Sequence, residues 1–239
     1  MIAYVRASGS PFQVGRAHGA ARRDTLQAFL ADGHARLDHL LPAPVDPRLV
    51  DEYAQVVRQA LPDLAEEISG LAVGAGIHEH DAFLLQVRRE LLGYSKIPAR
   101  GDCTTYARAG EVLAQTVDLN GNLDDVIGVL DVERDGRRAL ILTFGGLLGY
   151  LGVNSAGLAV GLNLVLGGDW RPGVPPYLAI RHLLDQASSV DEAVKILAGL
   201  PLASSRSIML CDATSAGYAE ILDGDVRFVP GAESVHTNH

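Results

Sequence analysis

Before Pro98, apolar side chains recur at the three- and four-residue spacing that is typical of amphipathic helices. The runs with this spacing are Leu26 to Leu30, Val56 to Leu61, Asp63 to Val73 and Asp81 to Leu92. We expect Asp81 to cap the last of them. Pro42, Pro44 and Pro47 separate the first two, because proline cannot donate a helical hydrogen bond. The pattern therefore predicts a helical N-terminal segment.

After Pro98 the pattern changes to short apolar runs separated by turns that contain glycine. Strands are predicted at residues 103–108, 112–118, 126–134, 138–144, 158–163, 207–211, 217–222 and 226–229. Two helices interrupt them, at 177–186 and 190–197, and Asp191 lies early enough in the second to interact favourably with the helix dipole. Asp135-Gly136 predicts a tight hairpin turn, and Val153 to Gly157 another turn. Helices and strands that come in blocks predict an α+β fold with antiparallel sheets.

Length and composition are typical of a globular protein with one large domain or two small ones. The 239 residues are 48% hydrophobic and 21% charged, which excludes a disordered chain. The net charge of −9 leaves no excess of basic residues, so we expect no nucleic-acid partner. No apolar stretch approaches the roughly 20 residues of a membrane span, and the start does not resemble a signal peptide. We therefore expect a cytoplasmic protein without a membrane partner.

Two cysteines are too few for a disulfide framework, so their chemistry depends on their surroundings. Cys211 lies in an apolar run and is interpreted as core. Cys103 follows Gly101-Asp102, and residue type alone leaves two interpretations open, a small buried residue or a nucleophile. As a nucleophile, its sulfur would attack the carbonyl of Asp102 and cut the chain there. The freed α-amine of Cys103, with a pKa of about 8, would then serve as a general base.

Five segments of the chain resemble one known family. They are Ser8-Gly9-Ser10-Pro11 with Gly15, His18 and Gly19; Gly101-Asp102-Cys103-Thr104-Thr105-Tyr106; Gly152 to Val160 with Asn163; Arg171-Pro172-Gly173-Val174-Pro175; and Val235-His236-Thr237-Asn238-His239. Together they resemble the acyl-coenzyme A:6-aminopenicillanic acid acyltransferase family over essentially the whole chain. The resemblance implies an αββα sandwich of the N-terminal nucleophile hydrolase type, made as a precursor that cleaves itself just before the cysteine.

This resemblance also implies a division of the chain and a role for each of four side chains. Residues 1–102 would form a helical pro-segment, and residues 103–239 the catalytic sandwich. Cys103 would be the nucleophile, Asp118 would orient its freed amine, Asn238 would contribute to the oxyanion hole, and Asn163 would be a second asparagine beside the nucleophile. Members of the family continue beyond the motif around Asn238, so the sequence is interpreted as incomplete at its C-terminal end.

Two positions depart from the pattern of the related enzymes. Asp102 precedes the nucleophile where glycine stands in the acyltransferase, and Gln115 stands where bile-salt hydrolases carry an arginine. Asp118, which is followed by Asn120-Gly121-Asn122, also has an ordinary interpretation as part of a turn.

The sequence thus predicts an autoproteolytic N-terminal cysteine amidohydrolase or acyltransferase that acts on small linear amides or thioesters through a thioacyl-enzyme. No cofactor is expected, although a coenzyme A thioester stays open as a substrate. No basic cluster suits the phosphates of coenzyme A, so hydrolysis is the expected default reaction. The expected protein partner is the chain's own cleaved N-terminal segment, and homo-oligomerisation is left open.

Two alternatives remain open. His236 with His239, and His78 with His80, have spacings found in metal sites, which would make the protein a metal-dependent hydrolase. The other alternative is a catalytically degenerate member of the same fold that acts as a binding protein.

Overall fold

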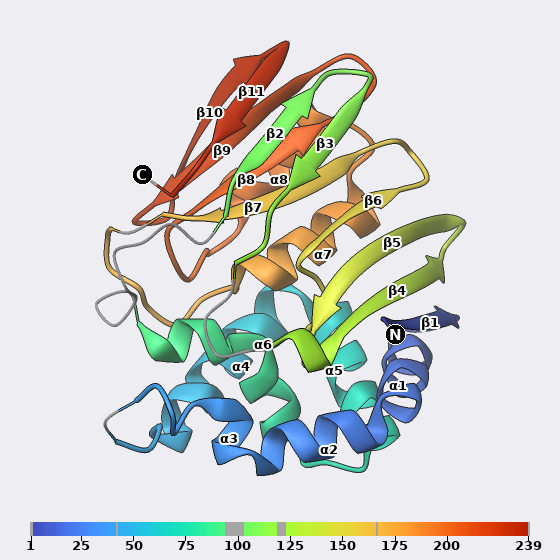
Figure 1. Cartoon of the computed structure of the whole chain (residues 1–239), viewed down its shortest axis with the longest axis vertical. Helices are drawn as coiled ribbons and strands as arrows, with labels where there is room; N and C mark the ends of the chain where they lie inside the picture. Colours follow the sequence, from blue (N-terminus) through green and yellow to red (C-terminus); the bar gives the residue numbers. More distant parts are fainter. Residues whose placement is uncertain (1, 42, 94–102, 119–122, 166, 239) are drawn as a thin grey trace.

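An eight-stranded sheet forms the centre of the protein, in the strand order β1-β4-β5-β6-β7-β8-β9-β10 (Figure 1). The computed structural model describes residues 2–41, 43–93, 103–118, 123–165 and 167–238. β1 pairs with β4 in parallel, whereas the other neighbours in this sheet are antiparallel. The strands are β1 (Ala3–Ser8), β4 (Ile127–Arg134), β5 (Arg137–Phe144), β6 (Leu151–Asn154), β7 (Ala159–Leu164), β8 (Arg206–Cys211), β9 (Ala216–Leu222) and β10 (Asp225–Gly231).

A second sheet packs on strands β7 to β9 of the first. Its three strands, in the order β11-β2-β3, are β2 (Thr105–Arg108), β3 (Val112–Gln115) and β11 (Glu233–His236). β8 is buried on both faces: Ile208 and Leu210 belong to the main core, whereas Met209 and Cys211 pack against the small sheet. Successive side chains of a strand point to opposite faces, so this alternation places β8 between two packed layers.

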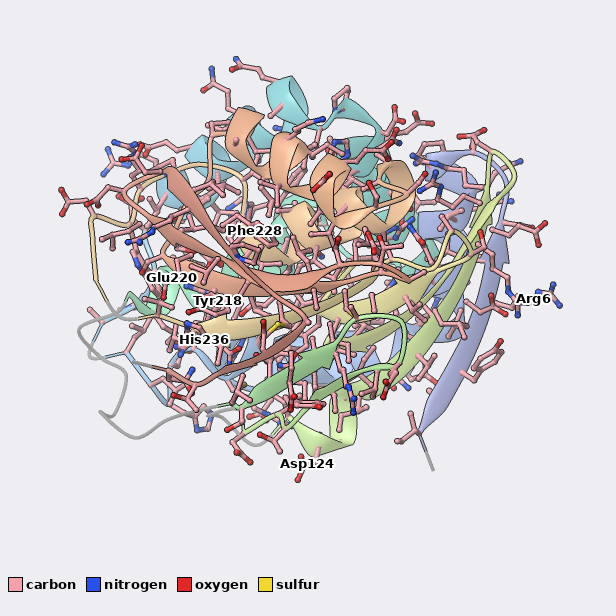
Figure 2. All side chains as sticks on the ribbon, turned by 90° about the horizontal axis from the view of Figure 1, so that it is seen from above. Arg6, Asp124, Tyr218, Glu220, Phe228 and His236 are labelled. Carbon is pink, nitrogen blue, oxygen red and sulfur yellow. The ribbon has the colours of Figure 1, made fainter. Side chains whose placement is uncertain are left out.

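Helices cover the other face of the large sheet (Figure 2). They are α1 (Pro11–Ala21), α2 (Arg23–Ala31), α3 (Gly33–Arg36), α4 (Pro47–Ala60), α5 (Pro62–Ala75), α6 (Glu79–Leu92), α7 (Pro176–Gln186) and α8 (Val190–Gly199), with a short 3-10 helix, η2, at Asp124–Val126. Proline opens α1, α4, α5 and α7, where its missing N–H group would have no helical partner in any case. In the described part of the chain, no helix has both the length and the apolar composition to cross a bilayer.

The N-terminal segment and the rest of the chain share one core. β1 extends the large sheet beside β4, and two buried ion pairs join N-terminal helices to later elements. Glu67 of α5 meets Arg181 of α7 through two contacts of 2.7 and 2.8 Å, and Glu90 of α6 lies 2.8 Å from Arg206 of β8. The predicted division between residues 102 and 103 therefore does not separate two cores. Cleavage of the chain at this position stays a prediction.

Helices α1 and α5 approach so closely that only glycine fits between them. A Cβ atom on Gly15 would lie 1.9 Å from the carbonyl oxygen of Glu67, and one on Gly19 would lie 2.2 Å from that of Leu71. Gly70 and Gly74 of α5 face the backbone of α1 in the same way. This contact fixes α5, and with it the Glu67 carboxylate that pairs with Arg181.

The predicted α+β class is confirmed, and so is the hairpin turn, because Asp135 and Gly136 both have positive φ angles, 51° and 77°. The layers run helix, sheet, sheet, and no described helix covers the outer face of the three-stranded sheet (Figure 1). The sequence predicts neither β1 nor the short β6. It also places the start of α6 too late: His78 already has the extended N-cap conformation, and Asp81 lies inside the first turn.

Candidate active site

Cys103 lies just before β2, where two asparagine side chains hold its main chain. Its N–H group donates to Asn238 Oδ1 at 2.8 Å, and Asn163 Nδ2 donates to its carbonyl oxygen at 3.0 Å. These partners also fix the orientation of both amides, because a backbone N–H can only donate and a carbonyl oxygen can only accept. The Cys103 side chain is buried. The structure thus brings together three of the four predicted catalytic residues.

The packing of the small sheet on the large one creates this arrangement. Asn163 belongs to β7, whereas Cys103 and Asn238 flank β2 and β11. Thr105 Oγ1 donates to Asn163 Oδ1 at 2.5 Å, and Asn238 Nδ2 donates to the carbonyl oxygen of Leu164 at 2.8 Å. Each asparagine therefore uses both ends of its amide to join β7 to the small sheet. The buried bonds of Asn163 are costly to lose, because a partner left unsatisfied costs about 1–3 kcal/mol.

Tyr150 lies against the Cys103 sulfur, a position that the sequence does not predict. Its hydroxyl is 3.7 Å from Sγ, and its side chain is buried. Burial raises the pKa of Tyr150 well above its usual value, and the nearby Cys103 adds to this shift. The hydroxyl therefore stays protonated and can donate a hydrogen bond to a thiolate. The available signal was a tyrosine inside the apolar run 147–151, since a buried tyrosine hydroxyl usually has a polar partner.

An apolar pocket opens beside Tyr150. Its lining consists of Phe29, Leu85, Arg88, Arg89, Leu92, Leu123, Phe144, Gly145, Leu147, Tyr150 and Tyr177. The Tyr150 ring stacks on Tyr177, with centroids 5.7 Å apart, and meets Phe144 edge-on at 4.9 Å. A concave, mostly apolar cavity with a few polar groups is the usual form of a small-molecule site.

Asp118 and Gln115 form no hydrogen bond with Cys103 among the described residues. The Asp118 side chain is exposed and forms no hydrogen bond with Cys103 in the described part of the chain, so its role stays a prediction. Gln115 binds the main chain of Leu162 through both ends of its amide, each at 2.8 Å, and so joins β3 to β7. Asp102, on the other side of the predicted cleavage site, lies outside the described residues.

The histidines of the metal alternative are dispersed. His236 Nε2 lies 3.2 Å from Glu220 Oε1, and its ring packs edge-on against Tyr218; Figure 2 shows these three side chains close together. His78 precedes α6, His80 Nε2 lies 3.3 Å from the carbonyl oxygen of Pro47, and His239 is outside the described residues. The described residues contain no group of three or more His, Cys, Asp or Glu side chains arranged to hold a metal ion.

Comparison with protein families matches residues 105–239 to the acyl-coenzyme A:6-aminopenicillanic acid acyltransferase family. The match begins after Cys103 and does not include it. A curated relative, the 40 kDa form of acyl-coenzyme A:6-aminopenicillanic-acid-acyltransferase from Emericella nidulans, is 31% identical over 248 aligned residues. That alignment covers 99% of this chain and 69% of the relative.

Three solved structures are partly similar. Penicillin V acylase from Agrobacterium tumefaciens has a TM-score of 0.35 at 19% identity, and the match covers 55% of this chain and 42% of that structure. An N-acylethanolamine-hydrolyzing acid amidase orthologue from Caenorhabditis elegans has a TM-score of 0.46 at 18% identity, and the match covers 57% of this chain and 70% of that structure. A conjugated bile acid hydrolase variant from Clostridium perfringens has a TM-score of 0.33 at 14% identity, and the match covers 60% of this chain and 47% of that structure. The chain thus spans less than half of two of these structures.

Proposed function

We propose that this chain, which belongs to the acyl-coenzyme A:6-aminopenicillanic acid acyltransferase family, is a self-processing N-terminal cysteine amidohydrolase or acyltransferase. Its substrates would be small linear amides or thioesters. The observation that carries the proposal is the pair of asparagines, Asn163 and Asn238, that hold the carbonyl and the N–H group of Cys103. Asn163 is fully buried and Asn238 is half-buried, and together they hold both main-chain groups of the cysteine.

The first step would be cleavage of the chain between Asp102 and Cys103. The Cys103 sulfur attacks the carbonyl carbon of Asp102, the C–N bond breaks, and the acyl group moves from nitrogen to sulfur. Water then hydrolyses this thioester, which leaves a carboxylate on Asp102 and a free α-amine on Cys103. With a pKa of about 8, the amine accepts and returns protons near neutral pH.

The second step would use the processed cysteine on a substrate. The thiolate attacks the carbonyl carbon, and the α-amine takes the thiol proton and passes it to the leaving amine or thiol. Asn238 Nδ2 carries two hydrogens: one donates to the carbonyl oxygen of Leu164, and the other would donate to the oxygen that becomes negative, a contribution of about 3 kcal/mol in comparable sites. The neutral Tyr150 hydroxyl, 3.7 Å from Sγ, stabilises the thiolate. Water or an amine then removes the acyl group from sulfur.

Intact mass analysis of the purified 239-residue chain under denaturing conditions tests the first step. We expect two species whose masses sum to that of the chain plus one water, with Cys103 at a new N-terminus. The Cys103→Ala variant should remain a single species, and Cys211→Ala, which removes the other thiol, should be cut like the wild type. An uncut wild-type chain that hydrolyses acyl amides would contradict the mechanism.

Hydrolysis and acyl transfer are separated by the fate of a radiolabelled acyl group. We expect mainly the free acid in buffer, because no added amine is then present to compete with water for the acyl group. High concentrations of an added amine should divert part of the label to an amide. If added amine never yields an amide, the acyltransferase half of the proposal is wrong.

A further inference from the structure

Two neighbouring contacts join the small sheet to the large one beside the nucleophile, and the proposed function uses one of them. In the first, Thr105 Oγ1 of β2 donates to Asn163 Oδ1 of β7 at 2.5 Å. In the second, His236 Nε2 of β11 lies 3.2 Å from Glu220 Oε1 of β9. His236 is the partner of Thr105 in the small sheet, and Ser207 of β8 pairs with Asn163 on one side and with Glu220 on the other. Directly paired residues point to the same face, so the two contacts lie in one polar layer between the sheets.

The His236 ring is held on several sides although it belongs to β11, an edge strand of the small sheet. The side chain is buried, and its ring packs edge-on against Tyr218 with the centroids 4.7 Å apart (Figure 2). Nδ1 donates to the carbonyl oxygen of Thr237, which can only accept. The bond between Nε2 and Glu220 then fixes the ring at its other nitrogen. A buried imidazole without such partners would be costly, so both bonds favour this one position of the strand end.

Asn238 lies two residues beyond His236, where β11 has ended. Its Oδ1 accepts from the main-chain nitrogen of Cys103 at 2.8 Å, and its Nδ2 donates to the carbonyl oxygen of Leu164 at 2.8 Å. The same main-chain nitrogen would become the free α-amine after cleavage. A shift of the end of β11 would therefore displace both the oxyanion donor and the partner of the general base. A misplacement of about 1 Å can cost about 100-fold in rate.

We propose that Glu220 and His236 are positioning residues, whose contact holds the end of β11 and thereby places the Asn238 amide at Cys103. The backbone ladder alone does not reach Asn238, because it ends at His236, opposite Thr105. The inference rests on the proposed function for the role of Asn238 in the reaction. The coupling between Glu220 and Asn238, however, depends only on the contacts at the end of β11 and is measurable without turnover.

The position of Asn238 is measured first, in the uncut Cys103→Ala chain. The amide hydrogen of residue 103 is bonded to Asn238 Oδ1, so its exchange with deuterium, followed by NMR, reports how firmly that side chain is held. We expect Glu220→Ala to accelerate this exchange by about tenfold or more relative to the amide of Ile208, whose buried strand reports global unfolding. Glu220→Gln should retain most of the protection, because a glutamine amide can still bond to His236 Nε2.

Non-additivity shows whether Glu220 acts through Asn238. In a chain that already carries Asn238→Ala, Glu220→Ala should accelerate the exchange by less than about twofold further. The matched control is Glu233→Ala, which removes a carboxylate from the other end of β11, where it binds the Tyr106 hydroxyl at 3.1 Å, and should leave the exchange unchanged. Full protection in Glu220→Ala, equal acceleration at residue 103 and Ile208, additive effects of the two substitutions, or an equal response to Glu233→Ala would each overturn the inference.

Turnover separates this inference from the proposed function. With hexanoic acid p-nitroanilide, and with rates expressed per processed chain, Glu220→Ala should lower kcat by about tenfold or more and change KM by less than about twofold. A Glu220→Ala chain that fails to cleave itself shows the same loss at the first step. If the wild type does not cleave the anilide while Glu220→Ala still releases the residue 103 amide, the catalytic proposal fails and the positioning contact stands. If the wild type and Glu220→Ala have the same kcat, the positioning role fails and the catalytic proposal stands.

Discussion

Replacing Asn163 by aspartate tests the arrangement at Cys103 with a change of one atom in the amide. The carboxyl group has the shape of the amide and keeps the oxygen that accepts from Thr105 Oγ1. The Nδ2 donor, which is 3.0 Å from the carbonyl oxygen of Cys103, becomes an oxygen. A protonated carboxyl group can still donate there, whereas an ionised one cannot. The folded state therefore favours the protonated form.

The size of the effect follows from burial and from the local partners. Asn163 is fully buried, and a fully buried carboxyl group with an unfavourable neighbour has its pKa raised by about 3 units or more. Since the unfolded pKa is about 3.9, the folded state binds more protons than the unfolded state between about pH 4 and 7. Stability relative to the parent thus falls as pH rises through this window, by about 1.4 kcal/mol per unit and by about 4 kcal/mol at pH 7.

The measurement is urea unfolding between pH 5 and 7, with Cys103→Ala as the parent chain so that cleavage does not change the species. We expect Asn163→Asp to lose about 2.7 kcal/mol more at pH 7 than at pH 5. Thr105→Val, which removes only the hydroxyl bonded to Asn163, should cost about 1 kcal/mol at both pH values. A loss for Asn163→Asp that is independent of pH, or one that shrinks as pH rises, would refute the assignment of Nδ2 to the Cys103 carbonyl.

Four further predictions address the packing and the thiol. Gly15→Ala should destabilise the protein by about 2 kcal/mol in urea unfolding, because its Cβ would meet the Glu67 carbonyl oxygen at 1.9 Å; Gly199→Ala, which meets nothing within 4 Å, should be neutral or stabilising. Glu67→Leu should lower the free energy of unfolding by about 3–5 kcal/mol, because it leaves Arg181 with Asp185 as its only carboxylate partner among the described residues. The double variant Glu67→Leu/Arg181→Leu should recover most of this loss, and equal losses in the two variants would contradict an ion pair. His18→Gln should make the stability of the protein less sensitive to acid. Burial, together with Arg181 and Arg22, lowers the pKa of His18 from 6.5 to about 3, so between these values only the unfolded state binds this proton. Between pH 7 and 4.5 the free energy of unfolding of the wild type should therefore fall by about 2–3 kcal/mol more than that of the variant. Tyr150→Phe in a Cys211→Ala background should shift the pH profile of Cys103 alkylation upward and lower kcat/KM about tenfold, and an unchanged profile would exclude a hydrogen bond to the thiolate.

Local patterns were sufficient to predict most elements of the fold. α4 and α5 follow from helical spacing and from the prolines that open them, and β4 and β5 follow from apolar runs around Asp135-Gly136. β1 was missed although Val5 and Ala7 alternate with exposed residues, because six residues carry little signal when their partner is β4, more than 100 positions away. β1 forms because it pairs with β4, and the local spacing of apolar residues carries no information about such a distant partner.

The candidate site was less accessible to reasoning from residues alone. Type and position left Cys103 open between core and nucleophile, and only the family resemblance singled out Asn163 and Asn238, whose amides act through a contact between two sheets. Tyr150 lies in an apolar run and has the character of a core residue until its hydroxyl is placed beside sulfur. Arg88 is similar: on an isolated amphipathic helix an arginine is expected in solvent, but α6 is covered on several sides, so even this charge is buried.

The burial of α6 has a consequence for processing. Gln86 donates to the carbonyl oxygen of Gly146 at 2.9 Å and accepts from the N–H group of Leu148 at 3.0 Å, which fixes the loop that leads to Tyr150. Glu90, two residues beyond Arg88, pairs with Arg206 on β8. These contacts do not depend on the peptide bond between residues 102 and 103. Cleavage there would free the α-amine of Cys103 while the N-terminal segment continued to form one wall of the pocket, so the proposed active enzyme is a complex of both fragments.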